Sequence, residues 1–389
     1  MTLRIPVSKL PNTGTTIFTV MSRLAEQHGA VNLSQGFPDF DPPRRLIELV
    51  SRHLAGHRNQ YAPMAGVMAL RETIAAEVER RFGVAPDVES EITITSGATE
   101  AIFCAVLALA GSGEEVIVFD PAYDSYAPAI TLAGAATVHL PLAPPDFRID
   151  FDRLKAALNE RTRLVVINTP HNPSGTLLAR EELAELAATL APWDCYLLSD
   201  EVYEHIVFDP AGHAGILANP ALRDRGIAIS SYGKTFHATG WKVGYAIAPA
   251  PLTSELRRVH QFCTFATTTP IQHAIADYLL ENPVHYTALP ELYREKRDDF
   301  LSAMTGTPFR FTPAAGTYFQ LADYGAISDL DDVEFSRRLT VEHGVATIPI
   351  SVFYESPPEA RLVRFCFAKQ AATLTEAARR LAGIRRIEA

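Results

Sequence analysis

Short apolar runs separated by helical stretches are the feature that most restricts how this chain can fold. The runs lie at residues 91–95, 115–119, 164–167, 195–198, 227–230 and 244–248, and the stretch at 98–110 is a strongly apolar helix. Runs that are apolar throughout and that alternate with helices indicate strands buried on both faces of one sheet. We therefore predict an α/β fold in which crossover helices cover both faces of the sheet.

The pattern changes after about residue 285. A charged helix is predicted at 292–304 and another helix at 332–343, with strands at 318–321 and 362–367 and a final helix. A chain of 389 residues also exceeds what one hydrophobic core usually serves. We predict three parts: 1–45 as an N-terminal arm that joins the smaller domain, 46–288 as the large domain, and 289–389 as the remaining smaller α+β domain.

Composition and charge restrict the partners of the protein. The formal net charge is −10 and no long basic run occurs, so we expect neither nucleic acid nor a membrane surface as a partner. No apolar run is long enough to span a bilayer, and the first residues lack the apolar core of a signal peptide. The 4 cysteines are far apart and three of them lie in apolar stretches, which is typical of reduced thiols in a core. These features predict a cytoplasmic protein.

A lysine, a rare residue in this chain, follows one of the predicted strands. Lys234 lies in the segment SYGKT at 231–235, directly after the run at 227–230. This is the end of a strand at which open α/β sheets bind ligands. A lysine flanked by glycine and small hydroxyl residues is a candidate nucleophile for Schiff-base formation, and a solvated loop lysine is the ordinary alternative.

Other chemically useful side chains also follow predicted strands, so we expect them to meet Lys234 in one crevice. They are Gly97, Ala98 and Thr99 after the first run, Tyr123 after the second, Asn172 after the third, and Asp200 and Tyr203 after the fourth. This set suits pyridoxal phosphate. Backbone N–H groups at 97–99 open a helix and can bind a phosphate, to which Ser231 and Lys242 add a hydroxyl and a cation.

The ring of the same cofactor also has partners in this set. Tyr123 is suited to stack on the pyridine, and Asp200 to pair with the ring nitrogen and keep it protonated, which makes the ring an electron sink. Asn172 and Tyr203 are suited to bond its phenolic oxygen. Each signal is weak alone, because an aspartate at a strand end is as often a helix cap. Their combination in this order predicts the cofactor.

An arginine interrupts the apolar strand at 362–367. Alternation places Arg364 on the buried side of that strand, where a guanidinium costs several kcal/mol unless it meets an anion. Its planar fork suits a carboxylate. The partner is either one of the chain's own acids or, given a cofactor that acts on amino acids, the α-carboxylate of the substrate.

Three other classes of function fit the sequence less well. The earlier glycine of a nucleotide-binding P-loop ending at Lys234 would fall at position 228, which is Ala228. A regulator on this fold would need a DNA-binding domain, and we expect none because the chain starts directly with the smaller lobe. A metal hydrolase would need a recognised ligand spacing, and none occurs among the acids and histidines at 200–213, so we predict no metal.

The motifs around these residues resemble one known family. Residues 231–244 (SYGKTFHATGWKVG), 172–175 (NPSG), 200–203 (DEVY) and 364–365 (RF) are similar, in order, to the motifs of fold-type-I, pyridoxal-phosphate-dependent aminotransferases of class I/II. The resemblance covers essentially the whole chain. The segment NLSQGFPDF at 32–40 resembles the kynurenine/glutamine transaminase branch, and 61–64 (YAPM) and 347–353 (TIPISVF) resemble its bacterial methionine aminotransferases.

This resemblance implies a fold and a role for each residue. The large domain would hold a mostly parallel, seven-stranded sheet between helices. Lys234 would form the Schiff base, and Asp200 would pair with the ring nitrogen. The phenolic oxygen would be contacted by Asn172 and Tyr203, and Tyr123 would stack on the ring. The phosphate would be held by Gly97, Ala98, Thr99, Ser231 and Lys242, and the substrate carboxylate by Arg364, Asn172 and the Gly36 backbone. Tyr61 would reach the phosphate of a neighbouring subunit, which implies a homodimer. Many relatives have arginine in place of Lys242, and lysine keeps the positive charge.

The expected reaction is ping-pong transamination between a 2-oxo acid and methionine or another uncharged or aromatic amino acid. Once the amino acid displaces it, Lys234 would act as base at Cα and as acid at C4′ of the cofactor. Phe18 and Phe353 are candidates to line an apolar substrate pocket with Tyr123 and Phe37, and plain core packing is the alternative for Phe18 and Phe37. The alternative activity is kynurenine or glutamine transamination with β-lyase activity on cysteine conjugates. The sequence does not fix the preferred donor or acceptor.

Overall fold

The computed structural model describes residues 3, 5–11 and 13–388. The helices are α1 (Ile17–Gln27), α2 (Arg44–Ala55), α3 (Met68–Phe82), α4 (Ala98–Leu109), α5 (Tyr126–Ala133), α6 (Phe151–Ala157), α7 (Arg180–Leu190), α8 (Pro220–Arg223), α9 (Tyr232–Thr235), α10 (Ala250–Cys263), α11 (Thr269–Glu281), α12 (His285–Ala303), α13 (Asp332–His343) and α14 (Ala371–Leu381). The strands are β1 (Val31–Asn32), β2 (Ile92–Thr95), β3 (Glu115–Asp120), β4 (Ala136–Pro141), β5 (Thr162–Asn168), β6 (Tyr196–Asp200), β7 (Gly226–Ser231), β8 (Gly244–Ile247), β9 (Phe319–Asp323), β10 (Val345–Ala346), β11 (Ile348–Pro349) and β12 (Leu362–Cys366).

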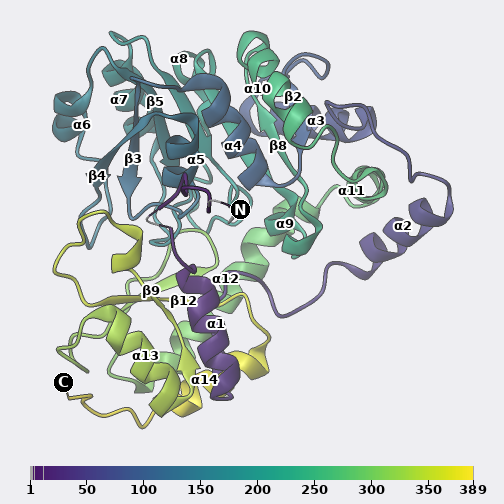
Figure 1. Cartoon of the computed structure of the whole chain (residues 1–389). Coiled ribbons are helices and arrows are strands. Elements are labelled where there is room, and N and C mark those ends of the chain that lie inside the picture. The colour runs from purple at the N-terminus through teal and green to yellow at the C-terminus, as the bar shows by residue number, and fades with distance from the viewer. Residues whose placement is uncertain (1–2, 4, 12, 389) are drawn as a thin grey trace.

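A seven-stranded sheet forms the centre of the larger part of the molecule (Figure 1). Its strand order is β2-β8-β7-β6-β5-β3-β4, and β8 alone runs in the direction opposite to the other six strands. The predicted α/β fold with a mostly parallel seven-stranded sheet is therefore confirmed. The six apolar runs match six of these strands. The seventh strand, β4, is an edge strand with partly exposed, mixed residues, so no apolar run marked it.

Helices cover both faces of this sheet because successive strand residues point to opposite sides. In β3, Val116 and Val118 belong to a hydrophobic cluster with α4, α5 and α10, whereas Ile117 and Phe119 belong to the cluster on the other face, with α3, α7 and α11. Every residue of β3 is buried. This explains why the strand reads as a continuous apolar run rather than an alternating one.

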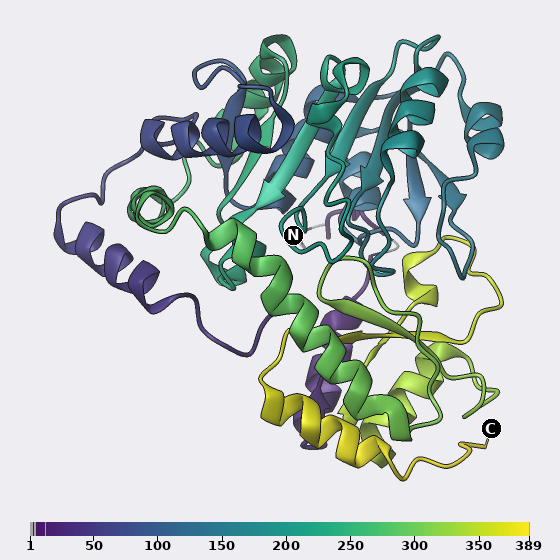
Figure 2. The same cartoon turned by 180° about the vertical axis from the view of Figure 1, so that it is seen from behind.

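The smaller part is built on a three-stranded antiparallel sheet of order β11-β12-β9 (Figures 1 and 2). Helices α12, α13 and α14 share a hydrophobic cluster with β9 and β12. The N-terminal segment joins this part, since β1 pairs in parallel with β10 and α1 contacts α13. The division at residues 45/46 and 288/289 stays a prediction.

Helix α12 begins earlier than the sequence pattern indicated. It starts at His285 rather than at 292 and contains Pro290 in its second turn. Proline normally marks the first turn of a helix because it lacks an N–H donor, so the pattern placed the helix start after it. The long α12 runs from the larger part into the smaller one (Figure 2).

Helix α2 projects from the body of the molecule and packs on α11 (Figure 1). Two ion pairs, Arg45 with Glu281 and Arg52 with Asp277, also join these helices. Within the described ranges, none of the helices combines the length and the apolar character needed to cross a bilayer.

Candidate active site

One pocket of about 240 Å³ lies at the carboxyl ends of the parallel strands, where open α/β sheets bind ligands. Among the predicted residues, those that line it are Phe18, Gly36, Gly97, Ala98, Thr99, Tyr123, Asn172, Asp200, Tyr203, Ser231, Lys234, Lys242 and Arg364. The structure thus brings together side chains from β6, α4, α9, β12 and the N-terminal segment. Because β12 and residues 18–36 belong to the smaller part, the pocket lies between the two parts.

Three residues considered at the sequence level do not line this pocket. Phe353 is buried behind it, with its ring 5.7 Å from that of Phe18. Tyr61 is 83% exposed and contacts Phe265. Phe37 is half-exposed and lies beside Lys369, so within this chain neither Tyr61 nor Phe37 reaches the cavity.

The N-terminus of α4 forms one wall of the pocket and suits an anion. Gly97 precedes the helix with φ +80°, and a Cβ there would lie 3.3 Å from Lys242 Nζ. A Cβ on Gly244 would lie 2.8 Å from the backbone N of Ala98. Small residues are therefore required where Lys242 and the first N–H groups of α4 come together. Free N–H groups at a helix end and a nearby ammonium are the elements of a phosphate site.

Lys234 lies on the short helix α9, directly after β7, and its amine faces the cavity. Loss of contact with bulk water lowers the pKa of this amine to about 8, from an ordinary 10.5. Lys234 Nζ donates a hydrogen bond to the hydroxyl of Tyr318 at 3.0 Å. About a tenth of the amine is therefore neutral at pH 7, and a nucleophile or general base needs this neutral form.

Asp200 ends β6 and is 4% exposed. Its Oδ2 accepts a hydrogen bond from the hydroxyl of Tyr126 at 2.6 Å, and its Oδ1 accepts one from the N–H of Val202 at 3.3 Å. Burial raises the pKa of Asp200 to about 6, while these hydrogen bonds oppose the shift. The carboxylate remains mostly ionised at neutral pH, so it can pair with a buried cationic nitrogen.

Arg364 lies on β12 and is 1% exposed, as strand alternation indicated. Its Nη1 donates to Asn172 Oδ1 at 2.7 Å and its Nη2 donates to the Ser34 carbonyl at 3.1 Å, while its Nε has no hydrogen-bond partner. Its guanidinium stacks on the ring of Phe319 at 3.8 Å.

None of the described acids forms a salt bridge with Arg364, so the internal ion pair considered at the sequence level is absent from the described part of the chain. Burial lowers the pKa of Arg364 from its ordinary value, because a buried cation without a counter-ion is unfavourable. An anion that enters the pocket would remove that cost, and a carboxylate matches the fork of the guanidinium.

Four further residues belong to the site and were not singled out from the sequence. Tyr126 bonds Asp200, Asn168 bonds the carbonyl of Asp200 and the N–H of Asn172, Tyr318 bonds Lys234, and Phe319 supports Arg364. Tyr126 and Asn168 had a usable signal, since each follows or ends a predicted strand. Tyr318 and Phe319 come from the smaller part, and nothing in the local sequence indicates their approach to Lys234.

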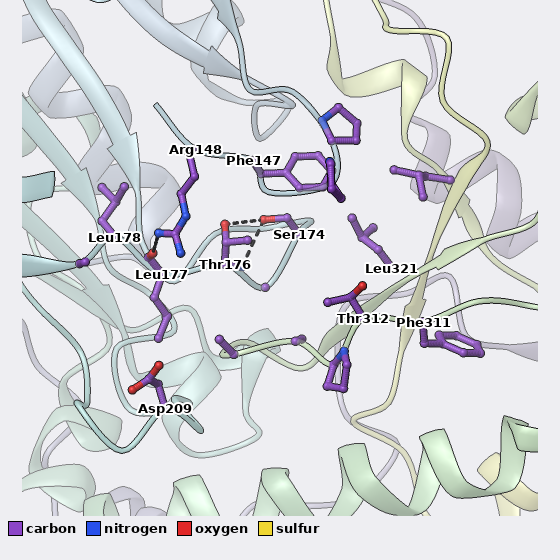
Figure 3. Close-up of a pocket in the computed structure, with 18 of the residues that line it drawn as sticks. Phe147, Arg148, Ser174, Thr176, Leu177, Leu178, Asp209, Phe311, Thr312 and Leu321 are labelled. Carbon is purple, nitrogen blue, oxygen red and sulfur yellow. Dashed lines mark hydrogen bonds between the residues drawn. The ribbon is translucent and has the colours of Figure 1, made fainter. Parts of the chain in front are cut away.

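A larger pocket of about 810 Å³ lies elsewhere between the two parts (Figure 3). Phe147, Arg148, Thr176 and Leu321 are among the residues that line it. Arg148 is already engaged with the carbonyl of Leu177 and with Glu182. Lys234, Asp200 and Arg364 all lie in the smaller pocket, so we place the candidate active site there.

One cluster of potential metal ligands occurs in the described ranges, formed by Glu100, Cys104 and His260. Glu100 Oε1 lies 2.9 Å from Cys104 Sγ and 2.7 Å from His260 Nδ1, and His260 Nε2 lies 3.1 Å from the Met64 carbonyl. Because each of these side chains already has hydrogen-bond partners, we assign the cluster to the packing of α4 on α10.

Comparison with known proteins assigns the chain to a family. The family of class I and II aminotransferases matches residues 28–381. A methionine aminotransferase of Escherichia coli (strain K12) is 56% identical over 97% of this chain and 98% of its own length. A kynurenine–oxoglutarate transaminase of Dictyostelium discoideum is 32% identical over 96% of this chain and 94% of its own length.

Solved structures agree with this assignment. The Escherichia coli protein YbdL, identified as a methionine aminotransferase, superimposes with a TM-score of 0.96 at 56% identity, covering 98% of this chain and 100% of that one. An N-succinyldiaminopimelate aminotransferase of Mycobacterium tuberculosis superimposes with a TM-score of 0.92 at 42% identity, again covering 98% and 100%.

This chain belongs to the class I and II aminotransferases, an enzyme family that depends on pyridoxal phosphate. The resemblance noted in the sequence and its fold-type-I architecture are therefore confirmed.

Proposed function

We propose that this aminotransferase moves the α-amino group of methionine, or of another uncharged or aromatic amino acid, to a 2-oxo acid by a ping-pong reaction. The observation that carries the proposal is the convergence of Lys234, Asp200 and Arg364 on one pocket at the strand ends. The 56% identity to a methionine aminotransferase over nearly the whole chain supports methionine as the donor.

Pyridoxal 5′-phosphate fits the residues of this pocket. The helix end at Gly97, where no Cβ can be placed without contact with Lys242, suits the phosphate, and the buried carboxylate of Asp200 suits a protonated ring nitrogen. The holding residues would be Gly97, Ala98, Thr99, Ser231 and Lys242 at the phosphate, Tyr123 on the ring face, Asp200 at the nitrogen, and Asn172 and Tyr203 at the phenolic oxygen. When bound, the cofactor supplies an aldehyde for the amino group and a ring that withdraws electrons from Cα.

The chain's own groups then do the binding and move the proton. Arg364 binds the α-carboxylate through its fork, with Asn172 and the Gly36 backbone beside it, and so fixes the direction of the Cα–H bond. Lys234 accepts the Cα proton. With a pKa of about 8, roughly a tenth of free Lys234 is neutral at pH 7 without any further shift.

The walls of the pocket favour an uncharged side chain on the substrate. Phe18 and Phe319 line it, and Phe353 supports Phe18 from behind. Its lining contains three cations, Lys234, Lys242 and Arg364, and each already has an assigned partner. No further arginine of the described residues lines the pocket to bind a second carboxylate, so we expect aspartate and glutamate to be poor donors.

Addition of L-methionine without any oxo acid tests the proposal. We expect the visible absorbance of the cofactor-loaded protein to shift, with one equivalent of the corresponding 2-oxo acid released per active site. L-Aspartate is the matched negative control. An absorbance band that responds only to kynurenine or glutamine would mean that one of these, and not methionine, is the amino donor. Release of pyruvate and ammonia from a cysteine conjugate would show the β-lyase alternative. Absence of any response to all of these would contradict the proposal.

We further infer a homodimer in which Tyr61 reaches the partner's phosphate site. Tyr61 is 83% exposed, and large apolar side chains are also exposed on α2, α10 and α11, of which α2 and α11 pack together on one side of the molecule (Figure 1). These are Ile47, Leu54, Phe262 and Leu280. Exposed apolar groups in such number commonly mark a protein interface.

Light scattering should give about twice the chain mass of 42.6 kDa. Tyr61→Ala should weaken cofactor binding about tenfold, as expected for one lost hydrogen bond to a charged group. Mixing Tyr61→Ala with Lys234→Ala chains should restore one intact site per mixed dimer. A single-chain mass in solution would contradict the shared site.

A cytoplasmic location is part of the same proposal. All 4 cysteines are free, and three of them are buried. Free thiols are usual in a reducing compartment. Cell fractionation tests this location.

A further inference from the structure

Tyr318 connects Lys234 to the backbone that faces the substrate site. Lys234 Nζ donates to the Tyr318 hydroxyl at 3.0 Å, and that hydroxyl donates its own proton to the Gly36 carbonyl at 2.6 Å. A phenol has one proton, so the bond to Gly36 leaves an oxygen lone pair directed at the amine. The orientation of this hydroxyl is thus fixed by both partners.

The Gly36 end of this connection adjoins the arginine site. Ser34, two residues earlier, accepts from Arg364 Nη2 at 3.1 Å. A Cβ built on Gly36 would lie 3.9 Å from that same Nη2 and 2.8 Å from the ring of Phe319. One short backbone segment therefore contacts both the group that would bind the carboxylate and the tyrosine that contacts the amine.

The backbone before Tyr318 is strained in a way that fixes this side chain. Thr317 has φ +67°, which is a rare conformation for a β-branched residue. It is held there because its N–H donates to the Ile206 carbonyl at 2.9 Å and its Oγ1 accepts from the Phe319 N–H at 3.1 Å. Strain of this kind persists where the surrounding structure imposes it, and it concentrates at functional sites.

Aromatic neighbours hold the ring of Tyr318 in place. Ring centroids lie 5.1 Å away for Tyr203, 5.8 Å for Tyr293 and 4.9 Å for Phe319, and Tyr318 itself has no solvent exposure. Phenylalanine would keep these ring contacts. The hydroxyl can therefore be removed without creating a cavity, which isolates its effect on Lys234.

We propose that Tyr318 is a positioning residue for the proposed transamination: its hydroxyl holds the free amine of Lys234 in the orientation for proton transfer and ties it to the Gly36 segment beside the substrate carboxylate. The inference rests on the proposed function for its role in turnover. The hydrogen-bonded contact itself does not depend on the identity of the substrate.

The first test uses the cofactor-free protein, so it has a readout besides activity. The rate at which Lys234 captures pyridoxal phosphate, trapped by borohydride, is measured against pH and reports the pKa of the amine. Wild type should give a midpoint near the pKa of about 8. Tyr318→Phe should move the midpoint to lower pH, because the ammonium loses an acceptor that stabilises it.

Tyr293→Phe is the matched control. Tyr293 is also fully buried and lies beside Tyr318, but its hydroxyl bonds His237 Nδ1 at 2.8 Å and not Lys234. This variant should keep the wild-type midpoint. Equal shifts in both variants would mean that only general packing had changed, and that result would overturn the proposal.

The second test separates binding from proton transfer. In single turnovers with methionine, Tyr318→Phe should slow the reaction roughly ten- to hundredfold, as expected for a misplaced reacting group, with little change in the methionine concentration for half-saturation. A wild-type rate and a wild-type capture midpoint in Tyr318→Phe would together refute the positioning role. If the wild-type protein itself does not react with methionine, the proposed function fails, while the capture midpoint still tests the contact between Tyr318 and Lys234.

Discussion

Lys234→Ala should lose the visible absorbance of lysine-bound cofactor and lower the rate of amino-acid turnover roughly ten-thousandfold, the upper range for a missing general acid–base group. The amine lines the pocket and is the nucleophile that we assign, and alanine could neither bond the cofactor nor accept the Cα proton. Spectra of the purified variant incubated with pyridoxal phosphate and single-turnover rates with methionine measure the two effects. Normal absorbance in this variant would contradict the assignment of Lys234.

Lys242→Ala is the informative control for that result. Lys242 lines the same pocket, next to Gly97, but we assign it to the phosphate rather than to the chemistry. Its loss should weaken cofactor binding while the lysine-bound absorbance still forms at saturating cofactor.

Folding is not expected to complicate the Lys234 comparison. The folded pKa of Lys234, about 8, lies below its ordinary 10.5, so burial of the ammonium opposes folding below about pH 8, and this cost falls as pH rises from 8 to 10.5. Removing the amine takes that cost away at neutral pH. Thermal unfolding of the cofactor-free proteins checks this point.

The central sheet could be predicted because its strands are buried on both faces and therefore read as apolar runs. The same reasoning explains the missed strand. β4 lies at the sheet edge, where Thr137 and His139 are tolerated, so its sequence carries no continuous apolar signal. The two-residue strands β1, β10 and β11 are too short for any periodicity and depend on tertiary pairing alone.

The residues of the candidate site also divide into those that the sequence could predict and those that it could not. Asp200, Asn172 and Lys234 follow strands of one sheet, and parallel strands bring their carboxyl ends to one edge, so their meeting could be expected from chain order. The approach of Tyr318 to Lys234 could not be expected from chain order. It depends on how the three-stranded sheet packs against the larger part and on the positive φ of Thr317, which a threonine does not signal.

Replacement of Arg364 should affect substrate binding more than any other single change in the pocket. Arg364→Ala should lower kcat/KM for methionine roughly 30- to 4,000-fold, because a desolvated charge pair with the α-carboxylate is lost. This factor corresponds to about 2–5 kcal/mol of lost interaction free energy. The loss should appear mainly in KM and should be similar for every accepted amino acid, since the carboxylate is common to all of them. Steady-state kinetics with methionine and phenylalanine measure it.

One further variant separates charge from geometry at this position, and another serves as a control for a buried arginine elsewhere. Arg364→Lys keeps the positive charge but not the planar fork that also bonds Asn172 and Ser34, so it should recover only part of the loss. Arg71→Ala is the control for a buried arginine outside the site: Arg71 is 3% exposed and bonds the Gly66 carbonyl at 3.2 Å. It should lower the stability and leave KM unchanged. An unchanged KM in Arg364→Ala would mean that the unpaired guanidinium serves the fold rather than the substrate, even though no acid of the described chain pairs with it.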